Sequence, residues 1–151
     1  MKRGVFRKPK VVVFDMDGTL INSFLDFKGL KKKMGFSEGA SVLEAIDEVV
    51  DAQKKQRLCQ QLDEFEMEGA RKAVLYKGAV EFLNFCDEEG LGRALLTRNS
   101  QKVTQLVLKK FHLNFGLVLH RENLQEPKPH PMGLEIVCEF FKIHKNDIIF
   151  I

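Results

Sequence analysis

Short runs of consecutive apolar residues alternate with longer amphipathic stretches along most of this chain. Residues 11–14 read Val-Val-Val-Phe, a pattern typical of a strand that is covered on both faces, as in a parallel sheet. Similar short runs recur at 94–96, 117–119 and 148–151, each after a stretch with helical spacing. Strands and helices of these lengths in alternation predict βαβ crossovers and one parallel sheet.

The helices that join these strands are indicated by their apolar stripes and their end residues. One is expected at 79–89, where Gly90 follows as a terminator. A second is expected at 100–111 with Ser100 as its N-cap, and a third at 131–142 with proline in its first turn. The pattern predicts an α/β fold with a Rossmann-like parallel sheet.

The segment between the first strand and Gly78 has a different pattern, because helical spacing continues there without a strand between the helices. Three helices are expected, at 24–34, 41–56 and 57–74. About sixty helical residues inserted after a first strand predict a small α-helical cap at 21–76. The α/β core is then expected to comprise residues 1–20 and 77–151.

The charge of the chain is concentrated at its start. The formal net charge of the 151 residues is +3, and five basic residues precede the first acid: Lys2, Arg3, Arg7, Lys8 and Lys10. Without them the net charge is −2, so the basic balance belongs to an N-terminal arm. A solvated tail is the simpler interpretation of this arm, and a nucleic-acid partner is not expected.

Cysteine usage and hydropathy favour an ordinary intracellular protein. Three cysteines at wide spacing (Cys59, Cys86 and Cys138) indicate small core residues or inert thiols, not a disulfide framework. No apolar run approaches the ~20 residues of a membrane helix, and no cleavable signal pattern follows the basic arm. A cytoplasmic location without a membrane partner is therefore predicted.

Candidate chemistry begins where the first strand ends. Asp15 and Asp17 lie at the carboxyl end of that strand, which is where open parallel sheets bind ligands. Two carboxylates at this spacing can converge on one cation and one reacting group, and Gly18 permits a tight turn beside them. A calcium-binding EF-hand is excluded because its glycine belongs at loop position six, and no dinucleotide or Walker motif occurs.

Three segments together resemble the signature motifs of the haloacid dehalogenase superfamily. Asp15-Met16-Asp17-Gly18-Thr19-Leu20 resembles the first motif in its phosphatase form, which carries the second aspartate. Leu95-Leu96-Thr97-Arg98-Asn99 resembles the second, a strand that ends in threonine. Lys128, within Glu126-Pro127-Lys128-Pro129-His130-Pro131, resembles the third. The chain thus looks like a phosphatase of this superfamily with a small helical cap.

The resemblance implies a role for each matching residue. Asp15 would attack phosphorus to form an aspartyl-phosphate, and Asp17 would act as general acid and then general base. Thr97, the backbone N–H of Arg98, and Lys128 would bind the transferring phosphoryl group. Mg²⁺ would be held by the Asp15 carboxylate and the Asp17 carbonyl. The implied substrate is a small phosphorylated metabolite, selected by the cap.

The sequence departs from the superfamily at its end. The fourth motif, an acidic group after the fourth strand, is missing because the chain ends at Ile151 within that strand. Asp147 cannot replace it, since it lies at the opposite end of the strand, roughly 13 Å away. A truncated form of a longer enzyme is the preferred explanation. A natural short form whose catalysis is weakened or lost is the alternative explanation. For the function, the alternatives are a non-catalytic binding module and a phosphomutase.

The same departure predicts an exposed sheet edge. If no strand pairs outside 148–151, this apolar segment presents unpaired backbone groups to solvent. Such edges pair with other strands, so self-association through this strand is expected.

Overall fold

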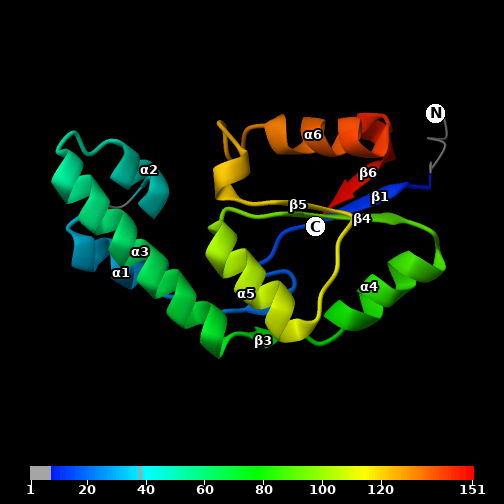
Figure 1. The fold of residues 1–151 in the computed structure, drawn as a ribbon, viewed down its shortest axis with the longest axis horizontal. Helices are drawn as coiled ribbons and strands as arrows, with labels where there is room; N and C mark the ends of the chain where they lie inside the picture. Colours follow the sequence, from blue (N-terminus) through cyan, green and yellow to red (C-terminus); the bar gives the residue numbers. More distant parts are fainter. Residues whose placement is uncertain (1–7, 38) are drawn as a thin grey trace, which may run out of the picture. The chain divides into compact units, whose positions relative to one another are not determined.

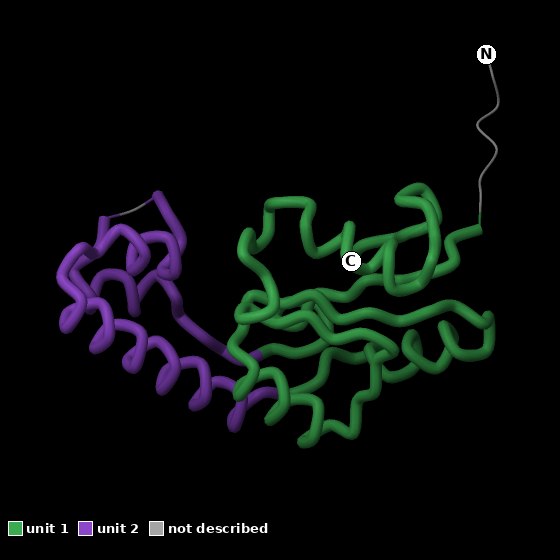
Figure 2. Tube along the Cα trace, turned by 45° about the horizontal axis from the view of Figure 1, so that its top comes forward, with its two compact units in different colours: residues 1–22, 74–151 green, residues 23–73 purple. Residues whose placement is uncertain are grey.

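The computed structural model describes residues 8–37 and 39–151, and by its contacts the chain divides into two compact units. The first unit comprises residues 1–22 and 74–151, and the second comprises residues 23–73 (Figure 2). Three members of the basic arm, Lys2, Arg3 and Arg7, lie outside the described residues. The interpretation of the arm and the predicted boundaries of the cap both stay predictions.

The first unit is built on a four-stranded parallel sheet, as predicted. Its strand order is β5-β4-β1-β6. The strands are β1 (Val11–Phe14), β4 (Gly92–Leu96), β5 (Leu117–Leu119) and β6 (Ile148–Phe150). β1 pairs with β4 on one side and with β6 on the other, in parallel register. All residues of β1 are buried, which explains its uninterrupted apolar run.

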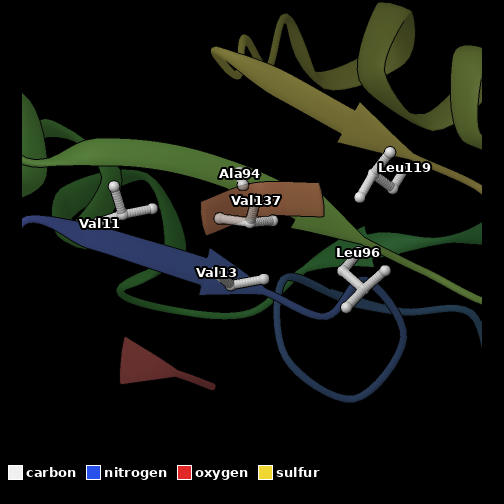
Figure 3. Packing of buried hydrophobic residues seen from close by; sticks show 6 residues of the cluster. All are labelled: Val11, Val13, Ala94, Leu96, Leu119 and Val137. Carbon is white, nitrogen blue, oxygen red and sulfur yellow. The ribbon is translucent and has the colours of Figure 1, made fainter. Parts of the chain in front are cut away.

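Helices cover both faces of this sheet, because successive side chains of a strand point to opposite faces. Val11 and Val13 of β1 pack with Val137 of α6 (Met132–Phe141) in a cluster that also contains Ala94, Leu96 and Leu119 (Figure 3). On the other face Phe14 makes edge-on ring contacts with Phe82 and Phe115. α4 (Ala79–Glu88) and α5 (Gln101–Phe111) lie on that face (Figure 1).

The three predicted helices of this unit are confirmed to within one residue at each end. Ser100 is the N-cap of α5, as predicted, and its hydroxyl accepts a bond from the N–H of Val103 at 3.4 Å. Two short 3₁₀ helices, η1 (Arg121–Asn123) and η2 (Lys145–Asp147), complete the connections. The bulk of the α/β fold therefore follows from periodicity and caps.

A small antiparallel pair in the first unit was not predicted from the sequence. β2 (Ile21–Asn22) pairs with β3 (Val74–Leu75), so the chain enters and leaves the helical unit side by side. Strands of two residues carry no readable period, and their pairing depends on a contact between positions about fifty residues apart.

The second unit is helical, but one of its breaks differs from the prediction. It contains α1 (Phe27–Met34), α2 (Val42–Asp47) and α3 (Ala52–Lys72). The predicted division at 56/57 is wrong, because a single helix runs through it and the break lies at 48–51. Asp51 begins α3 by accepting a bond from the N–H of Lys54 at 2.6 Å. No glycine or proline marks this break.

Apolar residues of all three helices pack together within the second unit, whereas Val50, in the break between α2 and α3, is 97% exposed. Leu30, Val42, Ile46, Leu58 and Leu62 form the buried cluster of this unit. In the part of the chain that the structure describes, no helix is both long and apolar enough to cross a membrane. The cytoplasmic location stays a prediction from the sequence.

Candidate active site

Asp15 stands at the point where β1 leaves the sheet. Its N–H donates to the carbonyl of Ile151 at 2.8 Å, so the main chain is still held by the neighbouring strand. Carboxylate Oδ1 accepts the N–H of Met16 at 2.7 Å, and Oδ2 lies 2.8 Å from the ammonium Nζ of Lys128. The side chain of Asp15 is 35% exposed. A fixed carboxylate beside a cation is thus accessible to a ligand.

The loop after Asp15 is closed by main-chain hydrogen bonds. The carbonyl of Met16 accepts the N–H of Leu20 at 2.9 Å, and the N–H of Gly18 donates to the carbonyl of Ile21 at 2.9 Å. Gly18 has a φ of +81°, which a residue with a side chain rarely adopts. The side chains of Met16 and Leu20 are buried and anchor the loop to the core. Asp17 is consequently presented on a short, constrained turn.

Asp17 is joined to the end of β4 through Asn99. The side-chain amide Nδ2 of Asn99 donates to Oδ2 of Asp17 at 2.5 Å and to the hydroxyl oxygen of Thr97 at 3.0 Å. The main-chain N–H of Asn99 also donates to that hydroxyl oxygen, at 3.1 Å. Thr97 and Asn99 are both buried. The structure therefore brings the first and second predicted motifs together at one sheet edge.

Arg98 lies between these two residues and is half-buried. Its carbonyl accepts a bond from the guanidinium of Arg121 in η1 at 3.5 Å. The N–H of Arg121 donates to the carbonyl of Asn99 at 3.0 Å. The backbone at 98–99 is therefore fixed against the segment that follows β5.

Lys128 reaches the site from the loop between η1 and α6. Its side chain is 18% exposed, and its ammonium lies 2.8 Å from Asp15 and 5.2 Å from the centroid of the Phe150 ring. An ammonium at that distance from an aromatic ring is attracted to it. The third predicted motif thus also meets the first, and β6 contributes an apolar wall.

Asp147 lies away from this group, as the sequence predicts. Its buried carboxylate pairs with Lys10 at 3.0 Å, just before β1 begins. This is the amino-terminal end of the parallel strands, whereas Asp15 stands at their carboxyl end. Asp147 is accordingly a structural partner of the chain entering the sheet.

The oxygen atoms at the end of β1 suit a hard divalent cation. The Asp15 carboxylate and the main-chain carbonyl of Asp17 are the kind of ligands that Mg²⁺ takes, together with waters and substrate phosphate oxygens. Among residues 8–37 and 39–151 no three His, Cys, Asp or Glu side chains gather as a metal site. The donors present therefore fit a magnesium ion that keeps most of its water ligands.

Two contacts in the site were missed by sequence reasoning. Asn99 was visible only as the last letter of the second motif, and its bond to Asp17 spans 82 positions of the chain. Phe150 appeared only as part of an apolar strand. The one available signal for Asn99 was its place two residues after Thr97, just beyond the end of a predicted strand.

Comparison with protein families gives a match over most of the chain. The model of the haloacid dehalogenase-like hydrolases matches residues 25–151. The matched range includes the second and third motifs and begins after Asp15 and Asp17.

Individual relatives agree with this match. A haloacid dehalogenase-like hydrolase domain-containing protein of Arabidopsis thaliana is 29% identical over 93% of this chain and 61% of its own length. A phosphoglycolate phosphatase of Pseudomonas fluorescens is 25% identical over 96% of this chain and 62% of its own length. The chain thus spans about three fifths of the length of these two relatives.

A solved structure has the same fold. The crystal structure of a HAD-superfamily hydrolase of subfamily IA from Geobacter sulfurreducens matches with a TM-score of 0.66 and 25% identity. It covers 94% of this chain and 78% of that one.

Proposed function

This chain belongs to the haloacid dehalogenase-like hydrolase family, and from that premise we propose that it hydrolyses a small phosphate monoester with the help of Mg²⁺. The observation that carries the proposal is the 2.8 Å contact between Oδ2 of Asp15 and Nζ of Lys128. The contact supports the proposal because the carboxylate proposed as nucleophile lies beside the ammonium proposed to bind phosphate. Asp17 stands on the same constrained loop, two residues further on.

In the proposed reaction a carboxylate oxygen of Asp15 attacks phosphorus, and the bond from phosphorus to the leaving alkoxide breaks. The product of this step is an aspartyl-phosphate. The ion pair with Lys128 supports this role, because it offsets the negative charge that would repel an approaching phosphate dianion. When bound, magnesium supplies further positive charge to the phosphoryl oxygens.

Asp17 is proposed to move the protons. In its protonated form it donates to the leaving alkoxide, and as a carboxylate it then accepts a proton from the water that attacks the aspartyl-phosphate. Hydrolysis releases inorganic phosphate and restores the Asp15 carboxylate. The turn at Gly18 supports this role by fixing the direction of the loop.

Thr97, Arg98 and Lys128 are proposed to bind the transferring phosphoryl group. Phosphoryl transfer passes through a loose transition state, so positioned donors and charge contribute most of the catalysis. Thr97 and Arg98 occupy the end of β4, the strand next to β1. Their contribution would come from a hydroxyl and a main-chain N–H.

A small phosphorylated metabolite is the proposed class of substrate. Several of the similar proteins carry the name phosphoglycolate phosphatase, which supports a small substrate for this chain too. The helical unit at 23–73 is proposed to act as a cap. Such caps exclude water and large molecules.

The alternative is a binding module that has kept the fold and lost turnover. It is favoured by the lack of a third acidic side chain near Asp15 and Asp17 in the described part of the chain. Because the relatives named above are longer than this chain, the activity of these 151 residues has to be measured directly.

The test is release of phosphate from 4-nitrophenyl phosphate by the 151-residue chain, with and without Mg²⁺. Asp15→Asn removes the nucleophile and should lower the rate at least about a thousandfold, since covalent catalysis is lost. Asp47→Asn is the matched control, because Asp47 is an exposed aspartate of the helical unit that pairs with Lys55.

Phosphate release that requires magnesium, fails in Asp15→Asn and persists in Asp47→Asn is the expected result. Equal rates in the wild type and in Asp15→Asn would contradict the proposed nucleophile. A folded wild-type chain that releases no phosphate but binds vanadate or phosphate would favour the binding module.

A further inference from the structure

Asn99 has no role in the proposed reaction so far, yet its side chain contacts two residues that have one. Asn99 is a buried polar residue whose amide nitrogen carries two hydrogens, and both are used. One is donated to Oδ2 of Asp17 at 2.5 Å and the other to Oγ1 of Thr97 at 3.0 Å. A single side chain thus connects Asp17, the proposed acid/base group on the loop after β1, to Thr97, the hydroxyl proposed to donate a hydrogen bond to the phosphoryl group.

The contacts also determine what the Thr97 hydroxyl can do. Its oxygen accepts two hydrogen bonds, from the main-chain N–H of Asn99 at 3.1 Å and from its side-chain amide. A hydroxyl has two acceptor positions and one hydrogen. With both acceptor positions occupied, the hydroxyl of Thr97 is left to act as a donor, which is what a phosphoryl oxygen requires.

Asn99 can act only as a positioning residue for Asp17. The amide donates to the carboxylate but exchanges no proton with it. A general acid helps only when its proton lies within hydrogen-bond reach of the leaving oxygen, so a carboxylate free to rotate would lose part of its effect. Held at one oxygen by Asn99, the carboxylate of Asp17 keeps its other oxygen for the substrate.

We propose that Asn99 is a positioning residue that orients the carboxylate of Asp17 and makes the hydroxyl of Thr97 a donor. This inference rests on the proposed phosphatase function. It assigns to the third residue of the Thr97-Arg98-Asn99 segment a role that is separate from phosphate binding.

The leaving group of the substrate separates this role from a structural one. An alkyl phosphate needs a proton on its leaving oxygen, whereas 4-nitrophenolate leaves without one. Asn99→Ala should therefore lower kcat about 10- to 100-fold on an alkyl phosphate, part of what general acid catalysis contributes. The loss on 4-nitrophenyl phosphate should be several-fold smaller, and Asn84→Ala, at an exposed asparagine of α4, should change neither rate.

An isosteric variant sharpens the comparison. Asn99→Asp keeps the size of the side chain but removes both donated hydrogens and places a carboxylate against Asp17. If Asn99 positions Asp17, this variant should be slower on the alkyl phosphate than Asn99→Ala. If Asn99 only fills space, Asn99→Asp should be the faster of the two.

The contact itself can be read without turnover. In an NMR spectrum the chemical shift of the Asn99 side-chain amide should change in Asp17→Asn. It should not change in Asp47→Asn, because Asp47 lies in the helical unit. In kinetics, adding Asn99→Ala to Asp17→Asn should cause no further loss specific to the alkyl phosphate, because the two residues act as a unit.

The outcomes separate the two proposals. If the wild type is active and needs Asp15, but Asn99→Ala slows both substrates equally or its amide does not respond to Asp17→Asn, the positioning role is overturned and the phosphatase function stands. If the wild type and Asp15→Asn release phosphate at the same rate, the proposed function fails on its own evidence. A leaving-group-dependent loss together with the amide shift is the supporting result.

Discussion

The two neighbours of β1 in the sheet differ sharply in what surrounds them. On one side, the residues of β4 that pair with the end of β1 are buried to 1% exposure or less. On the other side, Ile149 and Phe150 of β6 are 46% and 44% exposed. Both strands are parallel to β1 and apart from Arg93 both are apolar, so their residue types alone do not separate a covered strand from an edge strand.

The two sides of β1 also differ in the residues that they contribute to the candidate active site. At the covered side, the carboxyl end of β4 supplies Thr97, Arg98 and Asn99, which are held by hydrogen bonds to each other and to neighbouring loops. At the edge side, β6 supplies an aromatic ring beside Lys128. Preorganised polar groups thus come from the side of the sheet where packing fixes the backbone.

Two phenylalanines on adjacent strands give the largest expected contrast. Phe14 is buried, whereas the ring of Phe150 is nearly half exposed. Phe14→Ala should lower the free energy of unfolding by about 3–5 kcal/mol, because it leaves a cavity in the core. Phe150→Ala should cost about 1–2 kcal/mol, in proportion to the apolar area it buries. Urea unfolding of both variants measures the difference, and equal losses would contradict the contrast.

Loss of the Lys128 charge should affect the reaction and not the fold. Lys128→Met keeps an apolar stem but removes the ammonium beside Asp15. We expect kcat to fall about 10²- to 10³-fold, as when one preorganised electrostatic group is lost. Lys102→Met, at an exposed lysine of α5, is the control and should retain its activity. A small effect on kcat with a large rise in KM would assign Lys128 to substrate binding alone.

The start of α5 ties the covered side of the sheet to its helix. Ser100 is buried and caps α5, so Ser100→Ala should cost about 1 kcal/mol of stability. Ser100→Thr keeps a capping hydroxyl and should therefore retain most of the wild-type stability. Thermal unfolding measures both, and identical melting temperatures for Ser100→Ala and the wild type would show that the cap contributes nothing.

The exposed edge should show itself through association, with the smallest change in stability. Within the described residues β6 pairs only with β1, and its other edge carries no charge or proline. We expect the wild type to self-associate with rising concentration in light scattering. Ile149→Lys should suppress this while changing stability by less than about 1 kcal/mol. A wild type that stays monomeric at high concentration would contradict the proposed association.

Much of the fold could be predicted from local sequence because the signals are local. A buried run such as Val11–Phe14 and a cap such as Ser100 act over a few residues, and the structure confirms both. The break at 48–51 was misplaced because helical spacing continues on both sides of it and no glycine or proline interrupts it, so the cap at Asp51 was the one local signal. β2 and β3 escaped detection since only their pairing across the helical unit defines them.

By itself, the sequence determined the order along the chain of the four parallel strands and of the helices between β3 and β6, and the position of Asp15 and Asp17 after a buried strand. Both follow from side-chain periodicity and from residue types at a strand end, whereas Thr97, Arg98 and Lys128 became candidates only through the resemblance to the haloacid dehalogenase motifs. Only the tertiary structure decided that Lys128 meets Asp15 and that Asn99 joins Asp17 to Thr97. Such contacts form between residues up to 113 positions apart (Asp15 to Lys128), and no local pattern records them because they depend on how parallel strands align their carboxyl ends.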